Sequence, residues 1–90
     1  MTFAPKIWHD GHQRRTIFVV RTMVKNAEIL LLDSMARYTV KTISIAALAE
    51  ATDIDFGASQ ERKMKATIRR IAKKKGTTKK AHAAIKEVLS

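Results

Sequence analysis

The apolar and small positions between residues 14 and 38 repeat with the period of an α-helix. They are spaced alternately three and four residues apart, in the order Ile17, Val20, Val24, Ala27, Leu31, Ser34 and Tyr38. Such spacing is typical of a helix that buries one face. A second interpretation has a strand at 16–24, which is rich in β-branched residues, followed by a helix at 27–38 that Asn26 caps. The long regular spacing favours the continuous helix.

The middle of the chain predicts a connector and a short helix. The stretch 39–44 is short and β-branched, so we expect it to join two helices. Ser44 is a good N-cap residue, which predicts a helix at 45–51. The following stretch, 52–58, contains two aspartates and a glycine and reads as a loop.

The last third of the chain predicts two more helices. Ser59 is expected to cap a helix that runs to Lys75, with Gly76 ending it. Thr77 or Thr78 then caps a final helix at 79–89. The fold predicted from these elements is all-α, a small bundle of four helices in a single domain at 14–90, preceded by an irregular arm at 1–13. The alternative is an α+β fold with an N-terminal strand at 16–24.

Length and composition indicate a small core that would gain from a partner. A chain of 90 residues is enough for one domain and is only marginally stable alone. It contains no cysteine, which excludes disulfide bonds and cysteine-ligated zinc. We therefore expect a homodimer. Its interface would be the long helical stripe, through Ile17, Val20, Val24, Leu31 and Tyr38.

Charge is concentrated in the last third of the chain. The protein has a net charge of +10, with eleven basic and two acidic residues between positions 59 and 90. The first 58 residues carry seven basic and six acidic residues. Repulsion at such a density destabilises the compact state, so an unmixed basic region indicates a polyanionic partner.

The helix predicted at 59–75 is the expected contact with nucleic acid. Long basic side chains on such a helix reach phosphates on both walls of the DNA major groove, and residues near its start can read base edges. A second, smaller basic cluster lies beside Trp8 at Arg14 and Arg15. The candidate nucleic-acid-binding residues are Ser59, Gln60, Arg62, Lys63, Lys65, Arg69, Arg70, Lys73, Lys74, Lys75, Lys79, Lys80, Arg14 and Arg15.

Two segments resemble a known class of DNA-binding domain. The sequence from Ser44 to Asp55, with Leu48-Ala49-Glu50 at its centre, resembles the second helix and turn of helix-turn-helix and winged-helix regulators. The sequence from Ile68 to Gly76 is similar to the end of their recognition helix. The resemblance covers about residues 45–76 and implies a helix-turn-helix-like pair. It also implies that Ser59, Gln60, Arg62, Lys63 and Lys65 belong to the part of the recognition helix that faces the groove.

Other functional classes lack the residues they need. His9, Asp10 and His12 are too few to form a metal site, and His82 is distant in the sequence. We find no catalytic triad, paired carboxylates or glycine-rich phosphate loop, so we expect neither enzymatic activity nor a cofactor or small-molecule substrate. The longest purely apolar run, Ile29–Leu32, is too short to span a membrane. With no signal peptide evident, we expect a cytoplasmic protein.

Three functions are consistent with this pattern. The favoured one is a non-enzymatic DNA-binding protein, a transcriptional regulator or architectural factor, that contacts duplex DNA through the helix at 59–75. The first alternative is an RNA-binding or ribosome-associated protein, because basic helices also hold structured RNA by its backbone. The second is a basic inhibitor or assembly factor that docks on an acidic protein surface.

Overall fold

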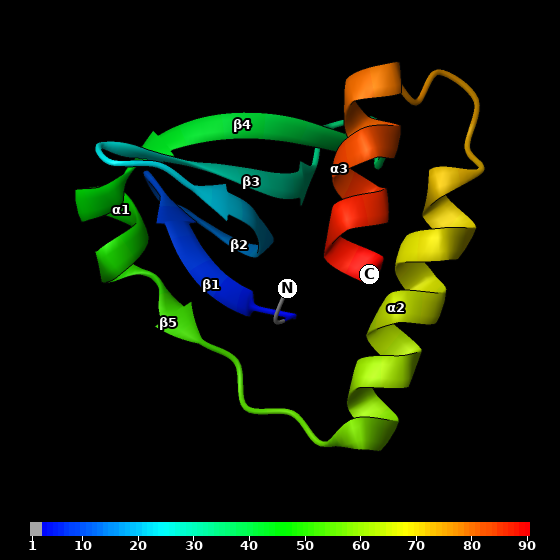
Figure 1. Cartoon of the computed structure of the whole chain (residues 1–90), viewed down its shortest axis with the longest axis horizontal. Coiled ribbons are helices and arrows are strands. Elements are labelled where there is room, and N and C mark those ends of the chain that lie inside the picture. Colours follow the sequence, from blue (N-terminus) through cyan, green and yellow to red (C-terminus); the bar gives the residue numbers. More distant parts are fainter. Residues whose placement is uncertain (1–2) are drawn as a thin grey trace.

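A five-stranded antiparallel sheet forms the centre of the molecule, and three helices surround it (Figure 1). This computed structural model describes residues 3–90. The strands lie side by side in the order β4-β3-β2-β1-β5. Along the chain the elements are β1 (Pro5–Asp10), β2 (Gln13–Thr22), β3 (Asn26–Leu32), β4 (Tyr38–Ser44), α1 (Ile45–Glu50), β5 (Thr52–Asp53), α2 (Ala58–Ala72) and α3 (Lys79–Leu89).

The predicted all-α bundle of four helices with a helix-turn-helix-like pair is therefore wrong, and the chain is α+β. Its alternative, a strand at 16–24, corresponds to β2. The helix expected at 27–38 and the connector at 39–44 are instead strands β3 and β4, paired from Asn26↔Ser44 to Leu32↔Tyr38. The irregular arm expected at 1–13 contains β1, which pairs with both β2 and β5.

The sheet is covered on both faces, and this explains the misleading pattern. Neighbouring residues of a strand point to opposite faces. Ile17 and Phe18 are both buried, but they belong to different hydrophobic clusters. When both faces are covered, a strand reads as a continuous apolar run and loses its alternation. An irregularity between Val19 and Arg21 also shifts the pairing register of β2 with β3. The helical spacing at 17–38 is thus a coincidence of two apolar faces.

Each face of the sheet has its own hydrophobic cluster. On one face, α2 and α3 pack over a cluster that includes Phe18, Leu30 and Ile68. On the other face, the short helix α1 and the partly buried Trp8 pack against the second cluster, which consists of Ile17, Ala27, Ile29, Leu31 and Ile43. Figure 1 shows α2 and α3 side by side at one end of the molecule and α1 at the other.

The helix boundaries follow local capping signals, with one exception. Ser44 Oγ accepts a hydrogen bond from Ala47 N at 3.0 Å, and Thr78 Oγ1 accepts one from Ala81 N at 3.1 Å, as predicted for α1 and α3. The predicted cap at Ser59 is wrong. Helix α2 begins at Ala58 after Gly57, whose backbone N donates to Gln60 Oε1 at 2.7 Å.

Helix α2 also ends earlier than predicted. Its last residue is Ala72 rather than Lys75, and Lys73 is the C-cap. Gly76 lies in the connection to α3 with φ of +92°, a left-handed conformation that glycine adopts without steric cost. The chain can therefore reverse there, so that α3 runs back along α2 (Figure 1).

Candidate nucleic-acid interface

Helix α2 is attached to the rest of the protein by one narrow face. Ile68 is fully buried, and Met64, Ile71 and Ala72 pack partly buried against the same cluster. These positions are three or four residues apart and therefore lie on one side of the helix. Arg62, Arg69 and Lys73 lie on one flank of the helix, outside this buried face, and are exposed to solvent. A helix of 15 residues, about 22 Å long, thus presents most of its circumference to a partner.

Most cations of α2 have no acidic partner in the described part of the chain. From residue 59 onward, the basic side chains that form an ion pair within residues 3–90 are Lys65, with Glu61 at 3.6 Å, and Lys80, with Glu28 at 3.8 Å. Unpaired charge therefore collects on α2 and its C-terminal connection, at Arg62, Lys63, Arg69, Arg70, Lys73, Lys74 and Lys75. Such an unmixed surface attracts anions over a distance set by the salt concentration.

One flank of α2 faces the sheet across a groove. A hollow of about 210 Å³ has Lys63, Met64 and Thr67 of α2 on one side and Thr16 and Tyr38 on the other, with Phe18 also lining it. A second hollow of about 270 Å³ continues it past Lys63 toward Phe56 and Gln60 at the start of the helix. The groove follows α2 and carries Lys63 on its helical wall.

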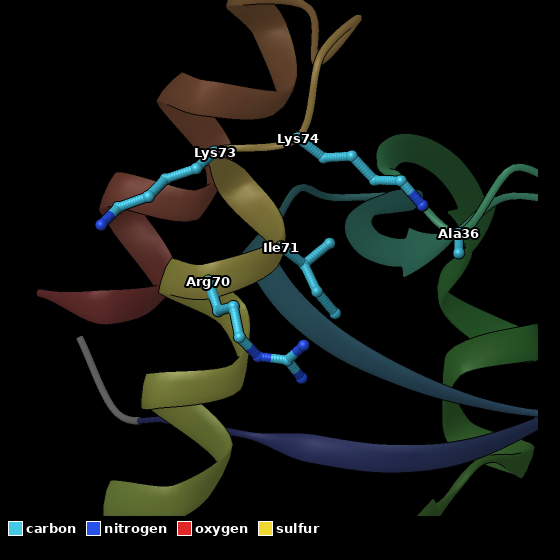
Figure 2. Close-up of a pocket in the computed structure, with 5 residues that line it drawn as sticks. All are labelled: Ala36, Arg70, Ile71, Lys73 and Lys74. Atoms are coloured by element: carbon cyan, nitrogen blue, oxygen red, sulfur yellow. The ribbon is translucent and has the colours of Figure 1, made fainter.

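A third hollow, of about 430 Å³, lies where the end of α2 meets the β3–β4 turn. Arg70, Ile71, Lys73 and Lys74 line it together with Ala36 of the turn. Figure 2 shows Lys74 extending from the helix toward the turn, whereas Lys73 points the opposite way. Lys74 Nζ donates a hydrogen bond to Met35 O at 3.0 Å, which fixes the turn against the helix.

The β3–β4 turn is ordered by Asp33. Its Oδ1 accepts hydrogen bonds from Met35 N at 2.8 Å and from Arg37 N at 3.0 Å. The bond from Arg37 N is the main reason that the pKa of Asp33 is lowered; partial desolvation opposes it, and the charges of Arg37 and Lys74 add to the lowering. Within this turn Ala36 has φ of +56°, a conformation uncommon for residues other than glycine. The turn is therefore held in one defined shape.

Tyr38, placed in the predicted dimer interface, instead packs between the sheet and α2. It is 6% exposed and lies edge-to-face with Phe18. Burial raises the pKa of its hydroxyl group, and the charge of nearby Arg70 partly offsets that rise. Four members of the predicted interface stripe are buried within the single chain, namely Ile17, Val20, Leu31 and Tyr38, and only Val24 of that set is exposed, at 95%. The homodimer stays a prediction, and it would require another surface.

The structure separates Arg14 from Arg15. Arg15 is half-buried, donates to Leu32 O at 3.0 Å and forms an ion pair with Asp10 at 3.8 Å, so it serves the sheet. Arg14 is exposed and lines a separate hollow of about 390 Å³ with His9 and Asp53 among its neighbours. Only Arg14 of this predicted pair remains free to meet a ligand within the described chain.

Among the other candidate residues of the last third, some side chains are engaged within the protein and others are exposed. Ser59 is exposed on the first turn of α2, whereas the carbonyl of Gln60 is used by the helix cap. Lys65 is occupied by Glu61 and lies 5.2 Å from the ring centre of Phe3. Lys79 and Lys80 begin α3, and Lys75 lies in the connection before it, so all three are near the C-terminal end of α2 (Figure 1).

Sequence spacing did not reveal the sheet side of this site. Thr16 and Ala36 contribute walls to the hollows beside α2. The favoured interpretation placed both Thr16 and Ala36 in one helix at 14–38, and neither residue carries charge. Their role depends on the pairing of distant segments, for which the sequence offers no local signal.

Comparisons with protein-family models, curated proteins and solved structures returned no match to this chain. The resemblance to helix-turn-helix regulators stays a prediction. In this fold α1 and α2, which carry the two similar segments, lie at opposite ends of the molecule (Figure 1) and are separated by β5.

Two further observations concern residues 3–90. No group of three or more histidine, aspartate or glutamate side chains is close enough to hold a metal ion. None of the helices in this part of the chain has both the length and the apolar character required to cross a bilayer.

Proposed function

We propose that this protein is a non-enzymatic DNA-binding protein that holds duplex DNA against α2. The observation that carries the proposal is the solvent-facing side of this helix, where the cations Arg62, Arg69 and Lys73 lack acidic partners among residues 3–90. The compartment that fits this proposal is the cytoplasm.

The dimensions of α2 suit a DNA groove. The major groove of B-DNA is about 12 Å wide and admits an α-helix. Helix α2 stands at the edge of the molecule (Figure 1) and packs through a single narrow face, so its other sides can approach both walls of the groove. Arg62 and Arg69 are seven residues apart, about 10 Å along the helix, which lets them contact separate phosphates.

The aromatic residues favour a duplex over a single strand. Proteins that hold unpaired bases usually stack them on exposed rings. Near α2, the rings of Phe3, Phe18 and Tyr38 are buried, and Phe56 packs edge-to-face against Phe3. Trp8 packs with the cluster on the other face of the sheet. A ligand at α2 is therefore held by its backbone, and the deep, narrow major groove of RNA excludes a helix that the DNA groove accepts.

A paired set of charge variants tests the proposal. In Arg62→Gln/Arg69→Gln, two cations on α2 are lost. In the control, Lys25→Gln/Lys41→Gln, two exposed cations are lost, one in the β2–β3 turn and one on β4. Binding to a fluorescently labelled DNA duplex is measured by anisotropy at fixed low salt. We expect the α2 variant to bind roughly thirtyfold more weakly, because each lost contact removes about 1 kcal/mol. The control is expected to stay within about threefold.

Competitors in the same assay separate the alternative functions. Structured RNA that displaces the duplex at lower concentration than unlabelled DNA would contradict the proposal in favour of an RNA partner. Absence of binding to either nucleic acid at low salt would contradict it in favour of an acidic protein partner. Equal losses in the two variants would show that net charge, rather than α2, determines binding.

A further inference from the structure

The hollow between the end of α2 and the β3–β4 turn is more strongly cationic than the other hollows described above. Its lining includes Arg70, Lys73 and Lys74 and contains no acidic residue. We propose that it is a seat for one backbone phosphate, held jointly by Arg70 and Lys74. This inference rests on the proposed function, because it names one specific point at which the DNA backbone is fixed.

The two side chains line the same hollow from the helix side. Arg70 and Lys74 are four residues apart, which puts them on one flank of the helix, about 6 Å along its axis. Figure 2 shows both on the side of α2 that faces the hollow. A guanidinium group binds phosphate through two parallel hydrogen bonds, and an ammonium group adds a point charge. Together they offer hydrogen-bond donors to both non-bridging oxygens of a phosphate diester.

The wall opposite the helix is preorganised. Asp33 fixes the turn through its bonds from Met35 N and Arg37 N, and Lys74 is tied to the turn through Met35 O. A seat whose walls are already ordered loses little conformational entropy when the anion enters. Ala36, held in its uncommon left-handed conformation, lines the hollow on this side with only a methyl group.

Two effects would oppose the binding of an anion in the hollow, and the cations of its lining outweigh both. The carbonyl end of a helix carries about half a negative charge, which repels an anion. Arg70 and Lys74 extend toward the hollow, whereas the charged end of Lys73, which also lines it, points away, so two cations keep the local sum positive. The carboxylate of Asp33 is the acidic group of the turn, and it is engaged by two backbone N–H groups and by Arg37 at 3.9 Å.

A shared phosphate predicts non-additive losses of affinity. We expect Arg70→Gln and Lys74→Gln each to weaken binding of the DNA duplex by about tenfold, and the double variant to be no more than about twofold weaker than the worse single one. The salt dependence gives a second readout. The slope of log affinity against log salt concentration should become less negative by about 0.9 in either single variant. The double variant should show the same change, since one phosphate contact is lost in each case.

The control cycle uses Arg62 and Arg69, which lie farther apart on the solvent-facing side. The fold-losses of affinity in the two single variants should multiply in the double variant, because the two residues contact separate phosphates. For the same reason the changes in salt slope should add to about 1.8. As a direct probe, inorganic pyrophosphate is titrated into the full-length protein while amide resonances are followed by NMR. The largest shifts are expected at Ala36, Arg70 and Lys74.

The outcomes distinguish the two proposals. Multiplying losses for Arg70 and Lys74, as in the control cycle, would overturn the shared seat and leave DNA binding intact. Pyrophosphate shifts spread evenly over all lysines and arginines would overturn it as well. Failure of the unmodified protein to bind the duplex would overturn the proposed function, and the seat with it.

Discussion

The basic residues of the sheet and those of α2 differ in how often they have an acidic ion-pair partner. Four basic residues of the sheet and its turns have an acidic partner: Arg15 pairs with Asp10, Arg21 with Glu28 at 3.0 Å, Lys6 with Asp53 and Arg37 with Asp33. Arg14, Lys25 and Lys41 form no ion pair within residues 3–90. On α2, Lys65 is the basic residue with an ion-pair partner among residues 3–90. Each exposed pair contributes about 0–1 kcal/mol, so pairing alone does not hold the sheet together.

This difference shows that the excess positive charge of the protein lies mainly in its last third, where α2 is found. The first 58 residues, which include the sheet, carry seven basic and six acidic residues, so their net charge is only +1. The same residue types without acids on one exposed helix create a positive field that costs stability and attracts polyanions. Glu28 and Glu87 join the sheet to α3, through ion pairs with Lys80 and Arg21. The acids thus link elements, whereas the cations of α2 are left for a partner.

The largest effect is expected from the apolar attachment of α2. Ile68→Ala removes its fully buried side chain and should lower the free energy of unfolding by about 2–5 kcal/mol, through lost burial and the cavity left behind. Val24→Ala, which alters a side chain that is 95% exposed, should change it by less than about 0.5 kcal/mol. Chemical denaturation measures both. A loss under 1 kcal/mol for Ile68→Ala would mean that α2 is not anchored as described.

A smaller effect is expected at the reversal between α2 and α3. Gly76→Ala forces a left-handed backbone on an alanine and places a methyl group 2.1 Å from Arg37 Nη1, so that side chain must move. We expect a loss of about 1–2 kcal/mol in thermal or chemical unfolding. Gly57→Ala is the control, because its φ of −98° suits any residue and the added carbon lies 3.8 Å from Gln60. Equal stability of the two variants would contradict the tight contact between the connection and Arg37.

The smallest effect is expected from acid at the β3–β4 turn. The pKa of Asp33 lies below its ordinary value of 3.8, since backbone hydrogen bonds favour the charged form. Its contribution to stability is therefore complete above pH 3.8 and is lost as the pH falls through the lowered pKa. NMR titration should show the amides of Met35 and Arg37 shifting together at that low pH, and Asp33→Asn should abolish the shift. A midpoint at or above 3.8 would contradict the bonding described.

Local signals in the sequence predicted the helices better than the strands. The caps at Ser44 and Thr78 are short-range hydrogen bonds between a side chain and a nearby backbone N–H, so the residue type alone identifies them. The helix at 79–89 was predicted with its bounds, and its apolar positions, including Ala81 and Ile85, are buried. These features require no knowledge of distant segments.

The hydrophobic pattern of the sequence did not identify the strands, because they are buried on both faces of the sheet. In Ile29-Leu30-Leu31, all three residues are buried although they alternate between the two faces. Periodicity cannot separate such a run from a buried helix, and the β-branched content at 16–24 was the better guide. The charge of α2 was evident from the sequence, but its groove was not, because Thr16 and Ala36 reach it only through strand pairing.

The salt dependence of duplex DNA binding tests the central claim most directly. With five to eight phosphates neutralised, the log–log slope of affinity against salt should be about −4 to −7. Arg62→Gln/Arg69→Gln should flatten it by about 1.8 and leave the free energy of unfolding within about 0.5 kcal/mol. Lys25→Gln/Lys41→Gln should leave the slope unchanged. A slope near zero for the unmodified protein, or the same slope in all three proteins, would contradict the claim that the unpaired cations of α2 meet the DNA backbone.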